Sequence, residues 1–568
     1  MDNLSAALRK EIKLNAPWDL IEKFSKQHRE KPEDANRGAE MIGNSLKALG
    51  IPVTMHAPEL FLSLPAEASV EANGVCYPAK PPAFCASMPE GIEADLIYVS
   101  EASGGTPLDR NPSANSKNVA GKIAVIQGFA LPNFVAGLEA AGASGVIAVN
   151  PGEMIHWGTV STIWGTPEPD DLARLPRIPS AAVNQKDGKK LIALAKSGGR
   201  ACIRTKLETG WFKQKMPVVE IPGSEKTEEF ILLHGHYDSW REGVGDNGTG
   251  NACMLEVARI LWNNRDMLKR SVRLAWWAGH STGRYGGSAW FADTFAIDLA
   301  ENCVAHMNCD SPGCRWATDY SRISCMSETE NFVQKVVSEV TGQQTMRKRP
   351  QRNSDYTFNN IGISACFMAS SMITDEKRIE KDYYIVGGCG GNIAWHTEAD
   401  TIEVADRDVL AKDIALYLEA VTSMANAEIL PFDWRATAAE FSATIYEYQK
   451  RAGNRFDLTA AADAIKALSS ALDNLYCAIE KGTISVKTAN PVLKDLARIM
   501  VPINYTRGPR FTHDPALNVP PLPAIAEATS LDGVPSDQIG FITTKLLRGR
   551  NRVVAALREA TRLVENAL

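Results

Sequence analysis

The chain has 568 residues, of which 45% are hydrophobic and 23% charged, and its formal net charge is −6. This length exceeds one hydrophobic core and predicts three or four domains at ~150 residues each. The net negative charge gives no electrostatic case for binding nucleic acid. No apolar run approaches the ~18 residues of a membrane span. The first residues lack a signal-peptide pattern, and the 11 cysteines include no CxxC pair, so we expect a cytoplasmic protein without a membrane partner.

The first predicted element is a helix over residues 18–50. Apolar side chains recur there at helical spacing, and the segment ends at a Gly-Ile-Pro sequence that stops a helix. Residues 98–183 then change to short β runs separated by Gly and Pro. Strands are predicted over 121–126 and 145–150, with a short helix over 133–143 between them. This β-α-β block is expected to form a self-contained insert.

Strands and helices alternate from residue 218 onward. Apolar strands are predicted over 229–233, 271–277 and 303–309, and a helix over 250–262. Such alternation predicts an α/β domain with a mixed, mostly parallel sheet flanked by helices. Ligands of these sheets bind outside the carboxyl ends of the strands, so we expect the chemistry of this chain at that edge.

The pattern becomes helical after Pro431. Apolar residues recur at helical spacing from Ala461 to Ile479 and again from Leu546 to Val564. Each stripe predicts a helix face that is buried, either against neighbouring helices or against a second protomer. We expect a C-terminal helical domain.

Five residues of the kind that bind metals follow strands or lie in Gly-rich turns of the α/β region. They are His236, Asp246, His280, Asp310 and His396. Two cations need neutral imidazoles and deprotonated carboxylates, and one carboxylate must bridge them. Asp246 suits the bridge because Gly245 and Gly248 free the backbone to turn it inward. Asp238, two residues after His236, is expected to support that histidine from behind.

The sequence around these residues resembles a known family, the co-catalytic zinc aminopeptidases, and in layout glutamate carboxypeptidase II and the transferrin receptor. The matching motifs are His236-Tyr-Asp238, Gly245-Asp-Asn-Gly248, Gly286-Gly-Ser288, Met307-Asn-Cys-Asp310, Ser354-Asp-Tyr-Thr-Phe358 and His396-Thr-Glu-Ala-Asp400. The resemblance implies a metallopeptidase-like domain over 1–60 and 210–432. It also implies a protease-associated insert over 61–209 and a helical dimerisation domain over 433–568, and therefore a homodimer.

The resemblance also implies a role for each ligand. His236 and Asp310 would bind one metal, Asp246 would bridge to a second, and His396 would bind the second. The family carries a pair of glutamates where this chain has Gly279-His280. His280 would replace the second glutamate as a metal ligand. Zinc is the expected ion, and the two-histidine, one-carboxylate set of Asp246, His280 and His396 also suits iron, manganese, cobalt or nickel.

Glycine at 279 replaces the glutamate that acts as general base in the family. It removes the usual means of activating water and leaves space that a substrate could occupy. Residues considered for proton transfer are His280, Asp238, Glu398, His234, Glu242 and Asp355. The Arg-rich segment 347–352 could clamp a substrate carboxylate. Substrate contacts are therefore expected from Arg352, Asp355 and Tyr356.

Three functions remain open from the sequence. The first is a metal-dependent hydrolase that cleaves an amide or related bond of a small or short peptide-like substrate. The second is a metal-dependent lyase, because a missing water-activating glutamate suits a reaction in which water is not the nucleophile. The third is a binding or scaffold protein that keeps the fold without the chemistry.

Overall fold

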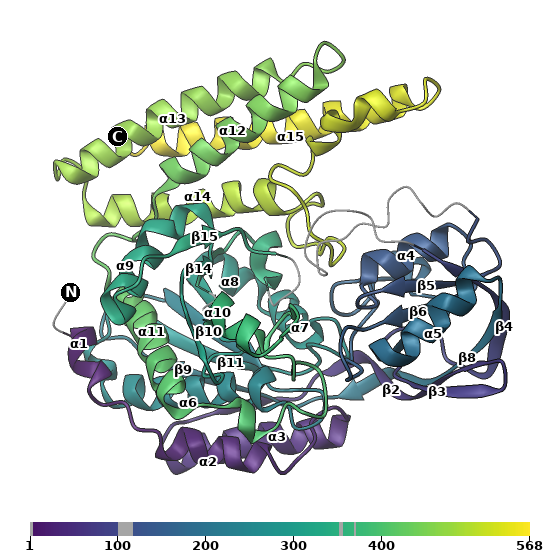
Figure 1. Cartoon of the computed structure of the whole chain (residues 1–568). Coiled ribbons are helices and arrows are strands. Elements are labelled where there is room, and N and C mark those ends of the chain that lie inside the picture. The colour runs from purple at the N-terminus through teal and green to yellow at the C-terminus, as the bar shows by residue number, and fades with distance from the viewer. Residues whose placement is uncertain (1–3, 100–117, 352–355, 368–370) are drawn as a thin grey trace.

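The computed structural model describes residues 4–99, 118–351, 356–367 and 371–568. Figure 1 shows an α/β body, a β-rich body beside it and a layer of long helices above the α/β body. Among the helices described, none combines the length and apolar character that crossing a membrane requires. The fold class expected from the sequence is confirmed: a mixed α/β domain with a β-rich insert and a helical C-terminal region.

The α/β body is built on a six-stranded sheet. Its strands in spatial order are β1 (Thr54–His56), β9 (Met216–Ile221), β11 (Ser271–Trp277), β10 (Phe230–His236), β12 (Cys303–Asn308) and β16 (Ser364–Phe367). The last four run parallel, whereas β9 is antiparallel to both of its neighbours. Every residue of β10 and β12 is buried, as expected of parallel strands covered on both faces.

Helices surround this sheet. They are α1 (Leu4–Arg9), α2 (Asn15–Phe24), α3 (Pro32–Ala48), α6 (Thr249–Asn263), α7 (Gly286–Thr294), α8 (Ala296–Asn302), α9 (Glu330–Thr341), α10 (Asp375–Glu380) and α11 (Arg407–Asn426). Both α6 and α11 pack on β10, while α7 and α8 contact β11 and β12. Two small sheets pair β13 (Ala317–Asp319) with β17 (Met372–Ile373) and β14 (Arg322–Ser324) with β15 (Met346–Lys348). Because the strands are buried under these helices, the polar side chains of a site have to come from the segments beyond the strand ends.

The helix predicted over 18–50 was wrong as a single element. The structure has two helices, α2 and α3, with a break between Phe24 and Pro32. Arg29 lies in this break and is fully buried, and its guanidinium donates to the carbonyl oxygens of Tyr237 (2.8 Å) and Gly243 (2.9 Å). Pro32 favours the first position of a new helix, since its missing N–H has no helical partner there. The tertiary contacts of Arg29 thus interrupt a pattern that is locally helical.

The β-rich body is a seven-stranded sheet in the order β3-β2-β8-β4-β5-β6-β7. Its elements are β2 (Glu59–Ala72), β3 (Val75–Ala79), β4 (Met88–Tyr98), β5 (Ile123–Gln127), α4 (Pro132–Ala140), β6 (Gly145–Val149), β7 (Ser180–Val183), α5 (Gln185–Lys196) and β8 (Arg200–Lys213). The predicted strands at 121–126 and 145–150 and the helix between them are confirmed within a few residues. The insert begins with β2 at Glu59 and ends with β8 at Lys213, and these two strands pair. The domain limits expected at 61 and 209 therefore fall inside β2 and β8.

Four long helices form the C-terminal layer: α12 (Trp434–Ala452), α13 (Thr459–Glu480), α14 (Val486–Tyr505) and α15 (Ile539–Glu565). The predicted stripes are buried: Ala461, Ile465, Leu468 and Leu472 on α13, and Leu546, Val553, Leu557 and Val564 on α15. Since α13 packs against both α12 and α15, these stripes are covered within the same chain. Of the two interpretations left open by the sequence, burial against neighbouring helices accounts for the stripes.

Candidate metal centre and its cavity

The five ligand-type residues come together at the carboxyl ends of the parallel strands. His236 ends β10, His280 follows the end of β11 by three residues, and Asp310 follows the end of β12 by two. Asp246 lies in the turn that leads into α6. His396 arrives from a separate loop ahead of α11. The parallel strands explain the positions of His236, His280 and Asp310, whereas long-range folding brings in the loop that carries His396.

Asp246 lies between two imidazoles. Its Oδ1 is 3.0 Å from His236 Nε2, and its Oδ2 is 3.1 Å from His396 Nε2. Asp310 Oδ1 lies 3.7 Å from the same His236 atom. One carboxylate that reaches two histidines through different oxygens has the arrangement a bridging ligand needs.

His280 is placed against His236. The two rings stack with centroids 3.9 Å apart and an interplanar angle of 12°. Ligand atoms of His236, His280 and Asp310 all lie within 4.8 Å of one another. The sequence grouped His280 with Asp246 and His396, and that assignment stays a prediction. The ring stacking and the ligand-atom distances bring His280 next to His236 and Asp310 as well.

The electrostatics of the site follow from burial and these contacts. Burial by itself lowers the pKa of His236, but its contacts with Asp246 and Asp310 outweigh that and hold the pKa well above the usual value. Burial likewise opposes ionisation of Asp246, yet His236 and His396 hold the pKa of that carboxyl well below its usual range. The site therefore keeps a buried carboxylate ionised beside imidazoles.

Asp238 supports two histidines, in a way that differs from the expectation. His236 Nδ1 meets the backbone oxygen of Asp238 at 2.9 Å, while the Asp238 carboxylate is 3.9 Å away. The carboxylate instead accepts the backbone N–H groups of His280 (3.0 Å) and Ser281 (3.3 Å). Asp238 thus fixes the ring of His236 through its carbonyl group and the loop of His280 through its side chain. We class it as a positioning residue.

Two further residues that the sequence did not single out hold the ligand turn. The buried carboxylate of Asp400 accepts the N–H groups of Gly245 (2.6 Å) and Asp246 (3.0 Å). The side chain of Asn247 donates to the carbonyl oxygens of His236 and Cys309 and accepts the N–H of Ser311. Asn247 therefore ties together the segments that carry His236, Asp246 and Asp310. Its place next to Asp246 and inside a quoted motif was the only signal in the sequence.

The inserted domain also contacts a ligand-type residue directly. The backbone N–H of Trp157 donates to His396 O (2.8 Å), and His396 Nδ1 lies 3.0 Å from Trp157 O. His156 Nδ1 is 2.6 Å from Trp395 O, and the Trp395 ring stacks on His396 at 3.8 Å. The loop that carries His156 and Trp157 thus fixes the orientation of the His396 imidazole.

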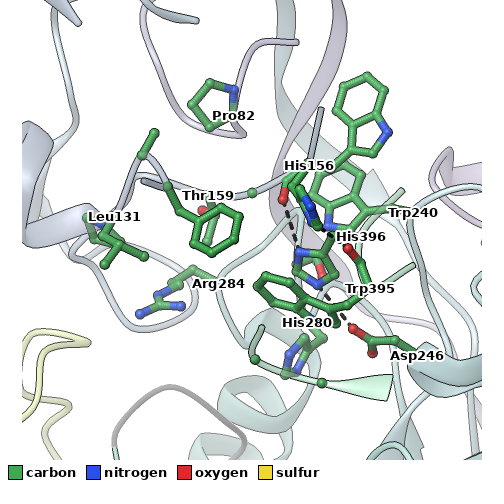
Figure 2. Close-up of a pocket in the computed structure, with 18 of the residues that line it drawn as sticks. Pro82, Leu131, His156, Thr159, Trp240, Asp246, His280, Arg284, Trp395 and His396 are labelled. Carbon is green, nitrogen blue, oxygen red and sulfur yellow. Dashed lines mark hydrogen bonds and ion pairs between the residues drawn. The ribbon is translucent and has the colours of Figure 1, made fainter. Parts of the chain in front are cut away.

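A cavity of about 480 Å³ opens over these residues, at the junction of all three bodies (Figure 2). Asp246, His280, Asp310 and His396 line it from the α/β body. Phe129, Leu131 and Pro132 come from the insert, and Leu517 comes from the segment between α14 and α15. The volume lies in the range of small-molecule sites.

Two described residues that were expected at the site, Glu398 and Tyr356, do not line the cavity. Glu398 is paired with Lys80 at 2.6 Å, and although burial opposes it, Lys80 lowers the pKa of that carboxyl below its usual value, which does not favour a general base. Tyr356 is buried, donates to Ser324 Oγ and is not among the described residues that line the cavity. Arg352 and Asp355 lie outside the described residues.

The remaining candidates for proton transfer are also engaged away from the cavity. His234 is fully buried in β10, with Nε2 3.0 Å from His306 Nδ1 and Nδ1 accepting from Trp277 Nε1. Glu242 lies 3.5 Å from His28. Neither of them lines the cavity within the described part of the chain.

One expectation about substrate space was wrong. A Cβ built on Gly279 would lie 2.8 Å from Leu62 Cδ2, so the space beside this glycine is filled by β2 and is not open to substrate. Arg347 lies 3.6 Å from Glu330, and Arg349 pairs with Glu440 at 2.8 Å. These arginines join the α/β body to α12, and neither lines the cavity in the described residues.

The donor set fits a divalent transition metal. His236 Nε2 and Asp246 Oδ1 are both buried and, within the described residues, neither has a hydrogen-bonding partner of acceptable geometry. Buried polar atoms are normally satisfied, so a cation that takes both as ligands explains the pair. The imidazole and carboxylate donors are those that zinc, iron, manganese and cobalt prefer.

Fold and site together define the class of α/β metallopeptidase-type domains that carry a protease-associated insert. Residues 218–421 match the model of peptidase family M28, and residues 92–191 match the model of the PA domain. Solved structures of this fold include an aminopeptidase from Aneurinibacillus (TM-score 0.54, 18% identity, 74% of this chain and 96% of that chain). A zinc aminopeptidase from Bacillus subtilis has a TM-score of 0.53 and 19% sequence identity, and the match covers 72% of this chain and 94% of that chain.

The curated relatives match a smaller part of this chain. Leucine aminopeptidase 2 of Trichophyton equinum is 28% identical over 312 residues, which cover 53% of this chain and 58% of the relative. Carboxypeptidase Q of Bos taurus is 29% identical over 122 residues, or 21% of this chain and 26% of the relative. The matches thus span less than two thirds of these relatives, and activity has to be argued from the site.

Proposed function

We propose that this protein is a metal-dependent hydrolase that cleaves an amide or related bond of a small, peptide-like substrate. The convergence of three histidines and two aspartates at one cavity carries the proposal. Asp246 in particular contacts one histidine through each of its two oxygens. A single ion pair would not require this arrangement, whereas a bridging metal ligand does. The names of the matched relatives, amino- and carboxypeptidases, favour hydrolysis. The comparisons give no support to the lyase or the scaffold interpretation.

The proposed ligands form two groups. His236, His280 and Asp310 would hold one ion, and Asp246 would connect it to a second held with His396. The first group is again two histidines and one carboxylate, so zinc is the expected metal and iron, manganese, cobalt or nickel also suit it. The zinc named for the Bacillus subtilis structure supports this choice. A bound cation of this kind polarises a carbonyl group and lowers the pKa of water.

The other residues of this chain position the metal ligands and keep bulk water away from them. Asp238 and Asp400 hold the loops of His280 and Asp246, and Trp395 covers one face of His396. We propose that Gly279-His280 stands where related enzymes carry two glutamates. No glutamate lines the cavity in the described chain, so the usual carboxylate base has no counterpart there. Activation of water then depends on the metal rather than on a glutamate of the protein.

A homodimer is proposed as well, held by residues after Asp433. The described C-terminal helices leave large apolar side chains in solvent, among them Phe541 (79% exposed) and Tyr446 (67% exposed). Exposed aromatic side chains on long helices are common in subunit interfaces. Light scattering should give twice the chain mass of 61.8 kDa, and a monomer mass at every concentration would contradict the dimer. A cytoplasmic location stays a prediction.

Metal analysis of the purified protein, followed by activity assays, tests the proposed function. We expect bound transition metal and turnover of short amides that is lost on chelation and restored by zinc, manganese or cobalt. Mass spectrometry of the products should show the addition of one water. Metal-loaded protein without turnover on any amide or peptide would contradict the hydrolase.

A further inference from the structure

One guanidinium faces the cavity together with the ligand-type residues. Arg284 follows His280 by four residues in the same loop, and the N–H of Tyr285 bonds to His280 O at 3.0 Å. Arg284 therefore lines the same cavity as the candidate metal ligands. In the view of Figure 2, its side chain extends toward Leu131 and away from Asp246.

Arg284 is held in place without being neutralised. One terminal nitrogen donates to Ala516 O at 2.9 Å, and the guanidinium lies 4.7 Å from the Tyr285 ring centroid. Its Nε is buried and has no hydrogen-bonding partner among the described residues. No ion pair to Arg284 is recorded in the part of the chain that the structure describes. A fixed guanidinium with unused N–H groups is a ready partner for a carboxylate, which it can bind through two parallel hydrogen bonds.

The carboxylates of the cavity also indicate that it suits a negatively charged group of a substrate. Within the described lining, the only carboxylates are Asp246 and Asp310, and both are proposed metal ligands. Neither would remain available to bind the ammonium group of a free amino terminus. The cavity therefore offers a guanidinium for a negative group and, in the described residues, no spare carboxylate for a positive one.

The remaining walls are apolar and aromatic. Leu131 and Pro132 lie at the start of α4, and Leu517 approaches from the C-terminal segment. Phe129 packs edge-on against Trp395 at 5.8 Å, next to the candidate metal centre. An apolar or aromatic group of a small molecule would be covered by these side chains.

We propose, building on the hydrolase function, that Arg284 binds a carboxylate of the substrate and that the substrate is a small N-acyl amino acid or related amide with an apolar or aromatic group. The reacting amide carbonyl would lie toward Asp246 and His396, and the carboxylate toward Leu131. Hydrolysis adds the oxygen of water to the acyl carbon and breaks the C–N bond. The proton goes to the released amine, so no further reactant is needed.

The binding test uses a carboxylate that cannot be hydrolysed. Titration calorimetry compares 3-phenylpropionate with its uncharged amide on the full chain, both metal-loaded and after chelation. A charge-assisted contact predicts that the acid binds about tenfold or more tightly than the amide. Arg284→Gln should remove this preference, whereas Arg284→Lys should keep part of it. Arg315→Ala is the matched control, because Arg315 pairs with Glu403 outside the cavity and should leave both affinities unchanged.

The same variants are tested on substrates. Wild type should hydrolyse N-acetyl-L-phenylalanine faster than N-acetyl-L-phenylalaninamide and L-phenylalaninamide, and Arg284→Gln should lose that preference mainly through KM. Turnover of none of the three compounds would contradict the hydrolase but not the anion site, which calorimetry decides separately. Melting temperatures of the variants check that they fold.

Two results would overturn the assignment of Arg284. One is equal binding of acid and amide by folded wild-type protein. The other is a preference for the acid that persists in Arg284→Gln and disappears on chelation, because the carboxylate would then sit on the metal. A wild-type preference for L-phenylalaninamide, which carries a free ammonium group and no carboxylate, would also contradict it.

Discussion

His234 and His236 lie two residues apart on β10, yet their surroundings differ completely. His234 is enclosed by the sheet, and its ring nitrogens meet those of His306 and Trp277. His236 ends the strand and meets Asp246 and Asp310. Both histidines follow the same apolar run, so the run itself does not distinguish them. What distinguishes them is which neighbouring segment covers the ring: strands in one case and carboxylate-bearing loops in the other.

The same lesson holds for two buried carboxylates. Asp246 faces imidazoles, which lower its pKa despite burial. Asp413 on α11 accepts from Gly313 N, Tyr320 Oη and Ser371 Oγ, and burial raises its pKa to about 6 although these donors oppose the rise. Burial is shared by both, and the charge of the neighbours decides whether a group is kept ionised. The following variants contrast the metal-facing members of these pairs with the structural ones.

The largest effect is expected for Asp246→Ala. Because this carboxylate reaches both His236 and His396, its loss should remove most of the bound metal and reduce activity by ~10³-fold or more, in the range found when catalytic groups are removed. Metal analysis after gel filtration measures the first effect, and initial rates the second. Metal content equal to that of wild type would refute the bridging role. Asp413→Asn serves as the matched buried acid and should keep its metal.

The histidine pair is tested by His236→Ala and His234→Ala. His236→Ala should lower metal content and activity, and because this ring is also buried its loss should cost stability as well. His234→Ala should leave metal content unchanged, but it leaves the Trp277 donor unpaired and opens a cavity, at a cost of roughly 2–4 kcal/mol in the free energy of unfolding. Chemical denaturation and metal analysis separate the two outcomes. Loss of metal in a folded His234→Ala protein would break the comparison.

Gly279→Glu sharpens the argument about the missing base. Gly279 has φ +65°, and a side chain there points at Leu62 instead of the cavity. We expect a loss of about 1–3 kcal/mol in stability and no gain in activity. Gly121→Glu is a matched control, since Gly121 has φ +73° with open space around it and should show only the backbone cost. A more active Gly279→Glu enzyme would mean that this position does reach the reacting atoms.

A further effect is a pH dependence of stability due to Asp413. Its pKa is raised to about 6 in the folded protein, so the folded state holds the proton more strongly than the unfolded state does. This contribution is fully present below about pH 4 and is lost as the pH rises through 6, amounting to roughly 2–3 kcal/mol. Stability measured from pH 4 to 7 should therefore fall in wild type relative to Asp413→Asn. Parallel profiles of the two proteins would contradict a raised pKa at this residue.

The fold was largely predictable because its signals are local. Apolar runs at 271–277 and 303–309 are too short for helices and alternate with helical segments, and they form β11 and β12 at nearly those limits. The helix predicted over 18–50 failed because Arg29 is held by Tyr237 and Gly243, more than 200 residues away in sequence. A periodic pattern carries no information about such a distant acceptor.

The candidate site was predictable as a set of residue types but not as an arrangement. The sequence contained His236, Asp246, His280, Asp310 and His396 in Gly-rich or strand-end contexts, and strand ends of a parallel sheet must meet. It expected the Asp238 carboxylate to support His236, whereas His236 meets the backbone oxygen of Asp238 and the carboxylate lies on the backbone of His280. It expected a carboxylate clamp in the segment 347–352, of which Arg347 and Arg349 pair with glutamates and Arg352 lies outside the described residues.

By itself, then, the sequence determined the layer structure, the inserted and helical domains and the ligand-type residues, because periodicity and spacing act over a few neighbouring positions. Only the tertiary structure decided that His280 stacks on His236 and that Trp157 of the insert fixes His396. It also decided that Arg284 faces the cavity together with Leu131 and Leu517. Each of these contacts joins segments from different bodies or distant loops. Their geometry is set by packing across interfaces, which no local pattern encodes.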